Sequence, residues 1–338
     1  MTPPDMTPPD MTPPDLTPSP TRTGRVPKVV IAEFMDEAAI AAELGGFATH
    51  YDPALVDRPG DLRAALADAD ALVVRNRTQV NAALLAAAPD LKVVGRLGVG
   101  LDNIDLDACR ARGVAVYPAT GANDVAVAEY VIGTAMLLLR GAYGASAAVA
   151  AGTWPRNALM GREISGKRLG LVGFGAIARE TARRALALGM RVSAYDPFLP
   201  ADDPAWRPDG GPVVRADRDG LIADSDVLSL HVPLTPETRG MIDAGVLARM
   251  PAGAVLINAA RGEVVDGAAV AAALRAGHLG GAALDVFPHE PLDAAAGALF
   301  RDLPNLILTP HIAGVTRESN VRVSRVTAQA VRRHLSED

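Results

Sequence analysis

The sequence has little of several residue types, and each scarcity excludes a class of protein. Cys109 is the only cysteine among 338 residues, so no disulfide framework can hold the fold, and a reducing compartment is expected. No run of about 18 apolar residues is present to span a membrane, and the N-terminus lacks the apolar core of a signal peptide. This pattern is typical of a soluble, cytoplasmic protein.

Aromatic residues and positive charge are also scarce. Only 4% of the residues are aromatic although 49% are hydrophobic, and the abundance of alanine favours Ala-rich helices packed closely on a sheet. The formal net charge of −6 argues against a surface that binds nucleic acid or another polyanion. We therefore expect no nucleic-acid partner, no membrane partner and no metal ion.

The N-terminal segment is a Pro-dense repeat. Residues 1–15 are three copies of Met-Thr-Pro-Pro-Asp, and a degenerate copy follows. Such a segment cannot bury enough apolar surface to offset the entropy cost of ordering it. Residues 1–25 are therefore predicted to be a disordered tail, and the remaining length is sufficient for two domains.

A glycine motif near the middle of the chain is the strongest functional signal. An apolar run over residues 169–172 leads into Gly-x-Gly-x-x-Ala, then a helical pattern, then a second apolar run that ends at Asp196. Gly173 permits a tight turn, Gly175 lets the backbone approach a pyrophosphate, and Ala178 allows close contact between helix and sheet. Asp196 is placed to bind a ribose 2′-hydroxyl and to repel a 2′-phosphate. The motif predicts a dinucleotide site that prefers NAD to NADP.

Strand and helix patterns alternate on both sides of this motif. Apolar strand-like runs cover residues 28–32, 71–75, 92–97, 113–117, 191–195, 226–232, 254–258, 281–285 and 306–309. A long apolar helical stretch over 123–149 would link the two groups of strands, and a last helix over about 316–334 would return to the first group. The alternation predicts an α/β protein with two doubly wound parallel-sheet, Rossmann-like domains and a cleft between them. We expect a flavodoxin-like substrate domain at 26–121 plus 312–338 and a NAD-binding Rossmann domain at 122–311.

Three polar clusters follow successive strands of the predicted cofactor domain. They place Arg261, Glu290 and His311 at neighbouring strand ends, where ligands bind in open α/β sheets. Oxidation of a 2-hydroxy acid requires a cation for the carboxylate, a base for the hydroxyl proton and a hydride acceptor. Arg261 can bind a carboxylate bidentately, His311 can act as the base because histidine is the common side chain that exchanges protons near neutral pH, and Glu290 would stabilise the imidazolium. Each residue alone has a purely structural explanation, but their occurrence together favours catalysis.

The order of these motifs resembles the D-isomer-specific 2-hydroxyacid dehydrogenase family. The resemblance covers about residues 28–335 and rests on the glycine motif and on the segments 258–266, 285–291 and 309–312. It implies an NAD-dependent enzyme in which His311 is the acid/base, Glu290 is its partner, and Arg261 binds the substrate carboxylate and polarises the carbonyl.

The same resemblance implies further site residues and an assembly. Asp285 would hold the nicotinamide carboxamide, and Val99 and Gly100 would offer backbone N–H groups to the substrate carboxylate. The cofactor site is also expected to include Ala176, Ile177, Val232, Pro233 and Ala259. Members of the family usually form homodimers through their cofactor domains, which predicts an interface that includes residues 123–149.

Basic residues of the first domain indicate the substrate class. One predicted strand is followed by Arg75, Asn76 and Arg77. Arg96 precedes the glycine loop, which is formed by residues 98–100. At matching positions, phosphoglycerate-type members of the family have cations for a second anion, which predicts a dianionic 2-hydroxy acid. The alternative is that these arginines form ion pairs with nearby acids, namely Asp102, Asp105 or Asp107.

Short sequence segments narrow the expected substrate further. Segments 33–37, 75–78, 95–98, 154–156 and 160–162 are most similar to sulfolactate dehydrogenases, which favours (S)-sulfolactate and sulfopyruvate as substrates. A 3-phosphoglycerate dehydrogenase or a hydroxypyruvate- or glyoxylate-type enzyme is the alternative. A non-catalytic, NAD-sensing corepressor with this fold is a more distant possibility. Formate dehydrogenases usually have Gln at the position of Glu290, which argues against that activity.

Overall fold

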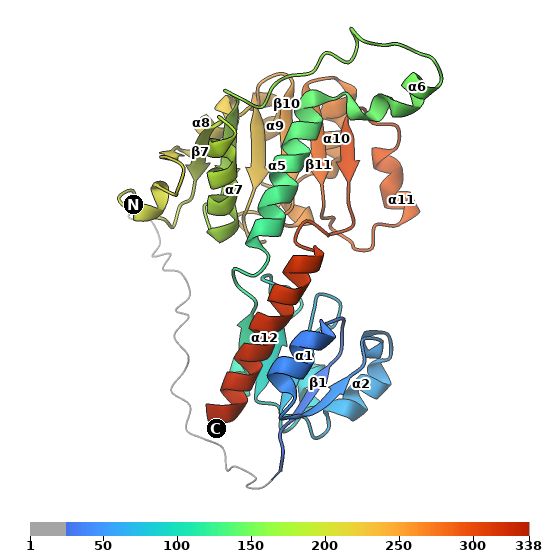
Figure 1. The fold of residues 1–338 in the computed structure, drawn as a ribbon, viewed down its shortest axis with the longest axis vertical. Coiled ribbons are helices and arrows are strands. Elements are labelled where there is room, and N and C mark those ends of the chain that lie inside the picture. Colours follow the sequence, from blue (N-terminus) through green and yellow to red (C-terminus); the bar gives the residue numbers. More distant parts are fainter. Residues whose placement is uncertain (1–24, 338) are drawn as a thin grey trace. The chain divides into compact units, whose positions relative to one another are not determined.

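The computed structural model describes residues 25–337, so the predicted tail lies outside the described residues except for Arg25. The described chain consists of two compact units (Figure 1). Unit 1 contains residues 25–123 and 316–337, and unit 2 contains residues 124–315. Each unit has its own sheet and its own core.

Unit 1 contains a five-stranded parallel sheet. Its strands are β1 (Lys28–Ile31), β2 (Ala48–Tyr51), β3 (Ala71–Val74), β4 (Val93–Arg96) and β5 (Ala115–Pro118), in the order β2-β1-β3-β4-β5. That order is the flavodoxin-like one. Strand β2 was not expected, because it lies at the sheet edge and its exposed and half-buried side chains give no apolar run.

Helices cover both faces of this sheet. They are α1 (Glu37–Leu44), α2 (Pro59–Leu66), α3 (Ala82–Ala86), α4 (Leu106–Ala111) and α12 (Arg317–Glu337). Alternate strand residues face opposite sides, so that Val29 packs with α1 and α12, whereas Val30 packs with α2, α3 and α4. The last helix, α12, therefore completes the core of the N-terminal strands (Figure 1).

Unit 2 contains a seven-stranded parallel sheet. Its strands are β6 (Arg168–Val172), β7 (Arg191–Tyr195), β8 (Val214–Arg215), β9 (Val227–Leu230), β10 (Ala254–Asn258), β11 (Leu279–Leu284) and β12 (Leu306–Leu308). The order β12-β11-β10-β9-β6-β7-β8 reverses between β6 and β9, which is the topological switch point where doubly wound sheets bind ligands. The predicted fold class, two doubly wound parallel sheets, is confirmed.

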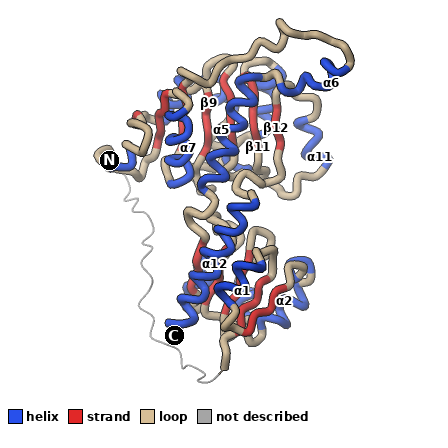
Figure 2. Tube along the Cα trace, in the orientation of Figure 1, coloured by secondary structure: helices blue, strands red, loops and turns tan. Residues whose placement is uncertain are grey.

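The helices of unit 2 also lie on two faces. They are α5 (Asp124–Arg140), α6 (Ser146–Ala150), α7 (Ala176–Ala187), α8 (Arg218–Asp224), α9 (Ala244–Arg249), α10 (Gly267–Arg275) and α11 (Ala294–Gly297). Helices α5 and α7 share one face (Figure 2), and α8, α9 and α10 pack on the other. Because strands β9 and β10 are covered on both faces, their sequences are nearly continuous apolar runs, interrupted only by Ser229 within β9 and Asn258 at the end of β10.

The long helix expected over residues 123–149 is interrupted. Helix α5 ends at Arg140 because Gly141 adopts a left-handed conformation with φ of 62°. The Leu139 carbonyl at this helix end accepts a hydrogen bond from Arg162 N (2.8 Å), and a short 3₁₀ turn then leads to α6. Within residues 25–337, no single helix is long and apolar enough to cross a membrane. Helix α5 and the helical segment 143–150 reach that length and apolarity only when they are taken together, and the two are bent by 66° relative to each other.

Candidate active site

The glycine motif forms a tight turn between β6 and α7. Gly173 has a φ of +87°, and a Cβ at this position would lie 2.4 Å from the His231 carbonyl oxygen after β9. Only glycine fits there. Gly175 is the N-cap of α7 and makes no side-chain cap, and a Cβ added to it would meet no heavy atom within 4 Å. The backbone at Gly175 is therefore not crowded on this side, and the N-terminus of α7 that follows it is the kind of site at which a pyrophosphate binds.

Asp196 lies one residue beyond β7, beside this turn. Its Oδ2 accepts a hydrogen bond from Phe174 N, and its Oδ1 accepts one from Phe198 N, both at 2.9 Å. The carboxylate is therefore fixed next to the glycine turn, where the ribose of a dinucleotide is expected. Ala178 is completely buried in the core that α5 and α7 share. These residues fit NAD.

Asp285, directly after β11, organises the loop that contains His311. Its carbonyl accepts the N–H of His311 (2.7 Å), Oδ1 accepts the N–H of Ile312 (2.9 Å), and Oδ2 accepts that of Ala313 (2.8 Å). His311 has a φ of 55°, a conformation that costs a non-glycine residue about 1–2 kcal/mol. The hydrogen bonds of the buried Asp285 hold the backbone of this loop in that conformation.

The side chains of His311 and Glu290 are in direct contact. The distance from His311 Nδ1 to Glu290 Oε2 is 2.7 Å, and Glu290 Oε1 accepts the N–H of Phe287 (3.0 Å). Because an ionised carboxylate only accepts hydrogen bonds, Nδ1 carries the hydrogen and Nε2 is the nitrogen that can exchange a proton with a substrate. His311 remains 38% exposed, so Nε2 is accessible.

Arg261 follows β10 in a turn braced by Asn258. The buried Asn258 amide donates to the Arg261 carbonyl (2.9 Å) and accepts from Ala260 N (3.0 Å). The next residue, Gly262, lies directly on the Glu290 turn, because a Cβ added to it would lie 2.0 Å from the carbonyl carbon of Phe287. The Arg261 and Glu290 turns are therefore packed against each other.

Strand register explains why these residues gather at one edge. Asn258 of β10 pairs with Leu284 of β11, and Leu284 pairs with Leu308 of β12. The parallel strands end side by side, so the residues that follow them lie together. The remaining predicted cofactor residues occupy the first turn of α7 and the ends of β9 and β10, namely Ala176, Ile177, Val232, Pro233 and Ala259.

Two hydroxyl groups behind Asp285 were not expected from the sequence. The Thr309 hydroxyl donates to Asp285 Oδ1 (2.6 Å), so the Tyr130 hydroxyl, 2.7 Å from Thr309 Oγ1, must be the donor in that contact. Burial raises the pKa of Tyr130 to about 12, which keeps the phenol protonated. Tyr130 lies within the apolar helical stretch expected over residues 123–149, and its place in that stretch was the only signal that could have revealed it.

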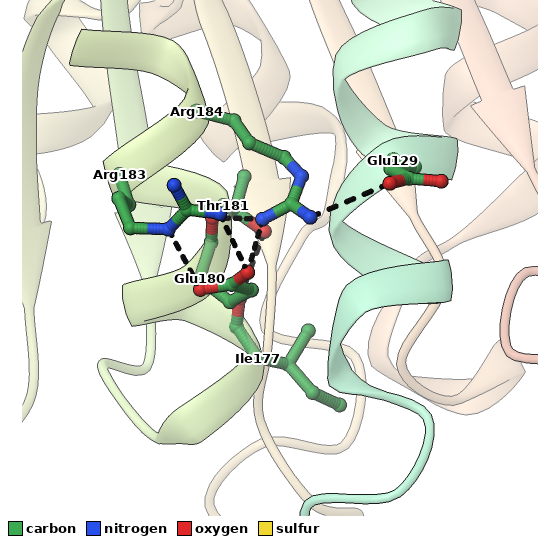
Figure 3. A network of polar contacts seen from close by, with 6 residues as sticks. All are labelled: Glu129, Ile177, Glu180, Thr181, Arg183 and Arg184. Atoms are coloured by element: carbon green, nitrogen blue, oxygen red, sulfur yellow. Dashed lines mark hydrogen bonds and ion pairs between the residues drawn. The ribbon is translucent and has the colours of Figure 1, made fainter. Parts of the chain in front are cut away.

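A network of ion pairs joins α7 to α5 in unit 2 (Figure 3). Glu180 accepts hydrogen bonds from Arg183 Nε (3.1 Å) and Nη2 (3.0 Å). It also forms an ion pair with Arg184, whose Nη2 lies 3.4 Å from Glu129 Oε1 on α5. The Arg183 hydrogen bonds are the main cause that lowers the pKa of Glu180 to about 2. The network links the helix that follows the glycine turn to its neighbour.

In unit 1, two of the predicted anion-binding arginines bind other groups of the same unit. Arg75 Nη2 donates to Asn320 Oδ1 on α12 (2.7 Å), and burial lowers the pKa of Arg75. The exposed Arg77 forms an ion pair with Asp57, which raises the pKa of Arg77. Neither contact involves the acids that the sequence offered as alternatives, so that alternative is wrong for the contacts of Arg75 and Arg77. Asn76, between them, is exposed.

Arg96 lies against the glycine loop that follows β4. Its Nη1 donates to the Leu97 carbonyl (2.9 Å) and lies so close to Gly98 that a Cβ there would be 1.5 Å from this nitrogen. Gly98 has a φ of +148°, which suits glycine. Val99 and Gly100, whose N–H groups were expected to bind the substrate carboxylate, follow Gly98 directly in this loop.

Comparison with known proteins adds independent information. Residues 132–313 match the family described as D-isomer specific 2-hydroxyacid dehydrogenase, NAD binding domain. The chain is similar to the (S)-sulfolactate dehydrogenase of Chromohalobacter salexigens, with 55% identity over 308 residues, which are 91% of this chain and 98% of that protein.

Two further similarities are more distant. The chain is 41% identical over 309 residues to the D-3-phosphoglycerate dehydrogenase of Mycobacterium tuberculosis, covering 91% of this chain but 56% of that longer protein. The crystal structure of D-lactate dehydrogenase from Aquifex aeolicus, complexed with NAD and lactic acid, matches with a TM-score of 0.78 and 28% identity. That match covers 92% of this chain and 96% of the other.

Proposed function

Because this chain belongs to the D-isomer specific 2-hydroxyacid dehydrogenase family and is an NAD-dependent oxidoreductase, we propose that its substrate is a dianionic 2-hydroxy acid. The preferred pair is (S)-sulfolactate and sulfopyruvate. The 2.7 Å contact between His311 Nδ1 and Glu290 Oε2, on a loop anchored by Asp285, is the observation that supports the catalytic part of this proposal.

In the reducing direction, we propose that protonated His311 gives its proton from Nε2 to the keto oxygen of the substrate. Bound NADH supplies the hydride for the keto carbon. Glu290 keeps the imidazole oriented and stabilises its charge until the proton moves. Arg261 of unit 2 is proposed to bind the substrate carboxylate and to polarise the carbonyl. In unit 1, the backbone N–H groups of Val99 and Gly100 are proposed as donors to a carboxylate.

The second anion of the substrate would bind to cations at the strand ends of unit 1. Val74 and Arg96 are register partners on adjacent strands β3 and β4, so the loop 75–78 and the glycine loop lie next to each other. Arg96 lies on Gly98, beside the N–H groups proposed to bind the carboxylate. Identity of 55% to a sulfolactate dehydrogenase supports a sulfonate as this second anion.

The test is a kcat/KM panel with sulfopyruvate, phosphohydroxypyruvate, oxaloacetate, hydroxypyruvate and pyruvate. Sulfopyruvate should be preferred by tenfold or more, because one charge-assisted hydrogen bond contributes about 1.5–3 kcal/mol, or roughly 10- to 100-fold. Arg96→Ala should reduce that preference. Arg110→Ala is the matched control, because Arg110 is an exposed arginine of the same unit that pairs with Asp107.

A phosphorylated substrate is the second candidate. The 41% identity to a phosphoglycerate dehydrogenase supports it, and a phosphate presents anionic oxygens to a guanidinium as a sulfonate does. Phosphohydroxypyruvate turning over best would establish this candidate. If pyruvate or glyoxylate turned over best, the proposal of a second anion would be wrong.

We further propose that the enzyme is a cytoplasmic homodimer. Several large apolar side chains of unit 2 are exposed on α5 and on the segment after it, namely Met136, Leu137, Tyr143, Val149, Trp154 and Met160. Trp154 and Met160 are 78% and 80% exposed, and an exposed group of this kind usually marks an interface. A monomeric mass by light scattering at micromolar concentration would contradict this proposal.

A further inference from the structure

Glu33 is a buried acid in unit 1 that the proposed reaction does not use. It stands two residues after β1, at the same sheet edge as the loop 75–78 after β3, and is only 4% exposed. Burial of a carboxylate requires partners that replace the hydration it loses. Its partners are therefore informative about its role.

Three backbone N–H groups of one loop point at this carboxylate. Arg75 N (2.9 Å) and Thr78 N (3.0 Å) donate to Oε1, and Arg77 N (3.2 Å) donates to Oε2. The loop is closed around Glu33 as such loops close around a bound anion. These three amides are therefore occupied by the protein's own carboxylate and are not available to a substrate anion, which leaves the loop's arginine side chains as its charged donors.

The opposite side of the loop is held by Asn103. The amide nitrogen of this buried residue donates to the Thr78 carbonyl (2.7 Å) and to the Arg75 carbonyl (3.3 Å). Donors and acceptors of the loop backbone are thus bound from both sides, which fixes the point from which the Arg75 and Arg77 side chains leave the backbone. The charge of Glu33 also favours the charged form of the half-buried Arg75, whose pKa burial lowers.

We propose that Glu33 is a positioning residue for the second anion: its carboxylate holds the loop 75–78 in the conformation from which Arg75 and Arg77 recognise the substrate's C3 group. This inference rests on the proposed dianionic substrate. The hydrogen bonds given above for Glu33 all come from backbone N–H groups of the loop, so its effect passes through the arginines, and it should change the affinity for dianionic substrates without changing the chemistry at C2.

The test is Glu33→Gln, assayed with sulfopyruvate and with hydroxypyruvate. A carboxamide has a single acceptor oxygen and turns an N–H donor toward the N–H groups of the loop. KM for sulfopyruvate should rise roughly 10- to 100-fold, the equivalent of one charge-assisted hydrogen bond, while kcat and the KM for hydroxypyruvate stay nearly unchanged. Glu37→Gln, which removes an exposed charge from the first turn of α1, is the control and should alter neither KM.

A second variant separates positioning from charge. Asn103→Ala releases the loop from its other side without altering a charge, and it should shift KM for sulfopyruvate in the same direction. If Glu33→Gln raises KM and Asn103→Ala leaves it unchanged, the effect is electrostatic and the positioning proposal is wrong. Equal rises in KM for both substrates would likewise overturn it, because general loosening of unit 1 does not discriminate between substrates.

The unaltered protein supplies a test that depends on no variant. The amide hydrogens of Arg75, Arg77 and Thr78 should be protected from exchange, and exchange as fast as in an unstructured peptide would overturn the proposal. Failure of the proposed function has a different signature. A wild-type enzyme with no preference for sulfopyruvate over hydroxypyruvate disproves the substrate class, whereas a preference that survives Glu33→Gln disproves only the role of Glu33.

Discussion

The two units hold the charged residues of their strand ends in different ways. In unit 2, His311 binds both Glu290 and Asp285, and all three belong to motifs that the sequence displays. In unit 1, Arg75 binds Asn320, which is 245 residues away in the chain, and its loop closes around Glu33. Neither of these partners lies in a motif with an assigned chemical role.

The comparison separates two requirements of an enzyme of this family. On the proposed function, proton transfer at C2 is common to all substrates of the family and would use groups that short motifs supply in unit 2. Recognition of the C3 group would differ between substrates and, in unit 1, would depend on contacts between remote segments. We therefore expect variants in unit 2 to change kcat and variants in unit 1 to change KM and specificity.

The largest expected effect is on the unit 2 side of this comparison. His311→Ala should lower kcat by about 10²–10⁴-fold, because it removes the proton donor, while the Kd for NADH stays nearly unchanged. Single-turnover reduction and NADH fluorescence titration measure the two quantities. Arg77→Ala in unit 1 is the counterpart. If this variant lowered kcat as much as His311→Ala does, the expectation that unit 1 variants change KM and not kcat would be wrong.

Glu290→Gln tests the unit 2 side of this comparison through the pH dependence of keto-acid reduction. Gln can retain the hydrogen-bonded geometry beside His311, but it removes the charge that stabilises the imidazolium. The pH profile of keto-acid reduction should therefore move to lower pH, since the protonated imidazole persists only in more acidic solution. An unaltered kcat/KM profile between pH 5 and 9 would show that Glu290 is only a turn residue.

Glu180→Gln tests whether the network between α5 and α7 stabilises unit 2. The pKa of Glu180 is lowered from 4.5 to about 2, so its ion pairs stabilise the fold fully above pH 4.5, and this contribution disappears as the pH falls toward 2. Because the group is partly exposed, the loss at pH 7 should be about 1 kcal/mol or less. Urea unfolding at pH 7, 5, 4 and 3 should show the difference from wild type shrinking below pH 4.5.

The control for that measurement is Glu163→Gln, an exposed glutamate of the same unit. It should change the free energy of unfolding little at any pH. A Glu180→Gln difference that does not depend on pH would mean that the carboxylate charge is not the source of the stabilisation.

The smallest effect is expected at Cys109, in the core of unit 1. The thiol is 1% exposed, and burial raises its pKa to about 11, so almost no reactive thiolate forms at neutral pH. A thiol reagent at pH 8 should label the native protein very slowly and the guanidine-unfolded protein completely. Fast labelling of the native protein would show that unit 1 opens more readily than its packing indicates. The tertiary contacts that hold the strand-end residues of unit 1 would then be less firm than the comparison assumes.

Much of the fold could be predicted because buried parallel strands are continuous apolar runs. The strands that were missed, β2 and β8, are both edge strands with exposed or half-buried residues, so they lack that signal. The interruption of α5 at Gly141 was missed for another reason. Alanine and leucine favour a helix on both sides of the glycine, and its left-handed conformation depends on the neighbouring backbone.

The sequence by itself determined the parallel α/β architecture, the glycine turn and the grouping of Arg261, Glu290 and His311, because successive parallel strands must end at the same edge of a sheet. Only the tertiary structure decided which groups bind these three residues and which groups bind the arginines of unit 1. A buried charge takes whichever partner the fold brings within hydrogen-bond distance, whatever its separation in the chain. The partners Asn320 for Arg75 and Glu33 for the loop 75–78 were therefore fixed by packing.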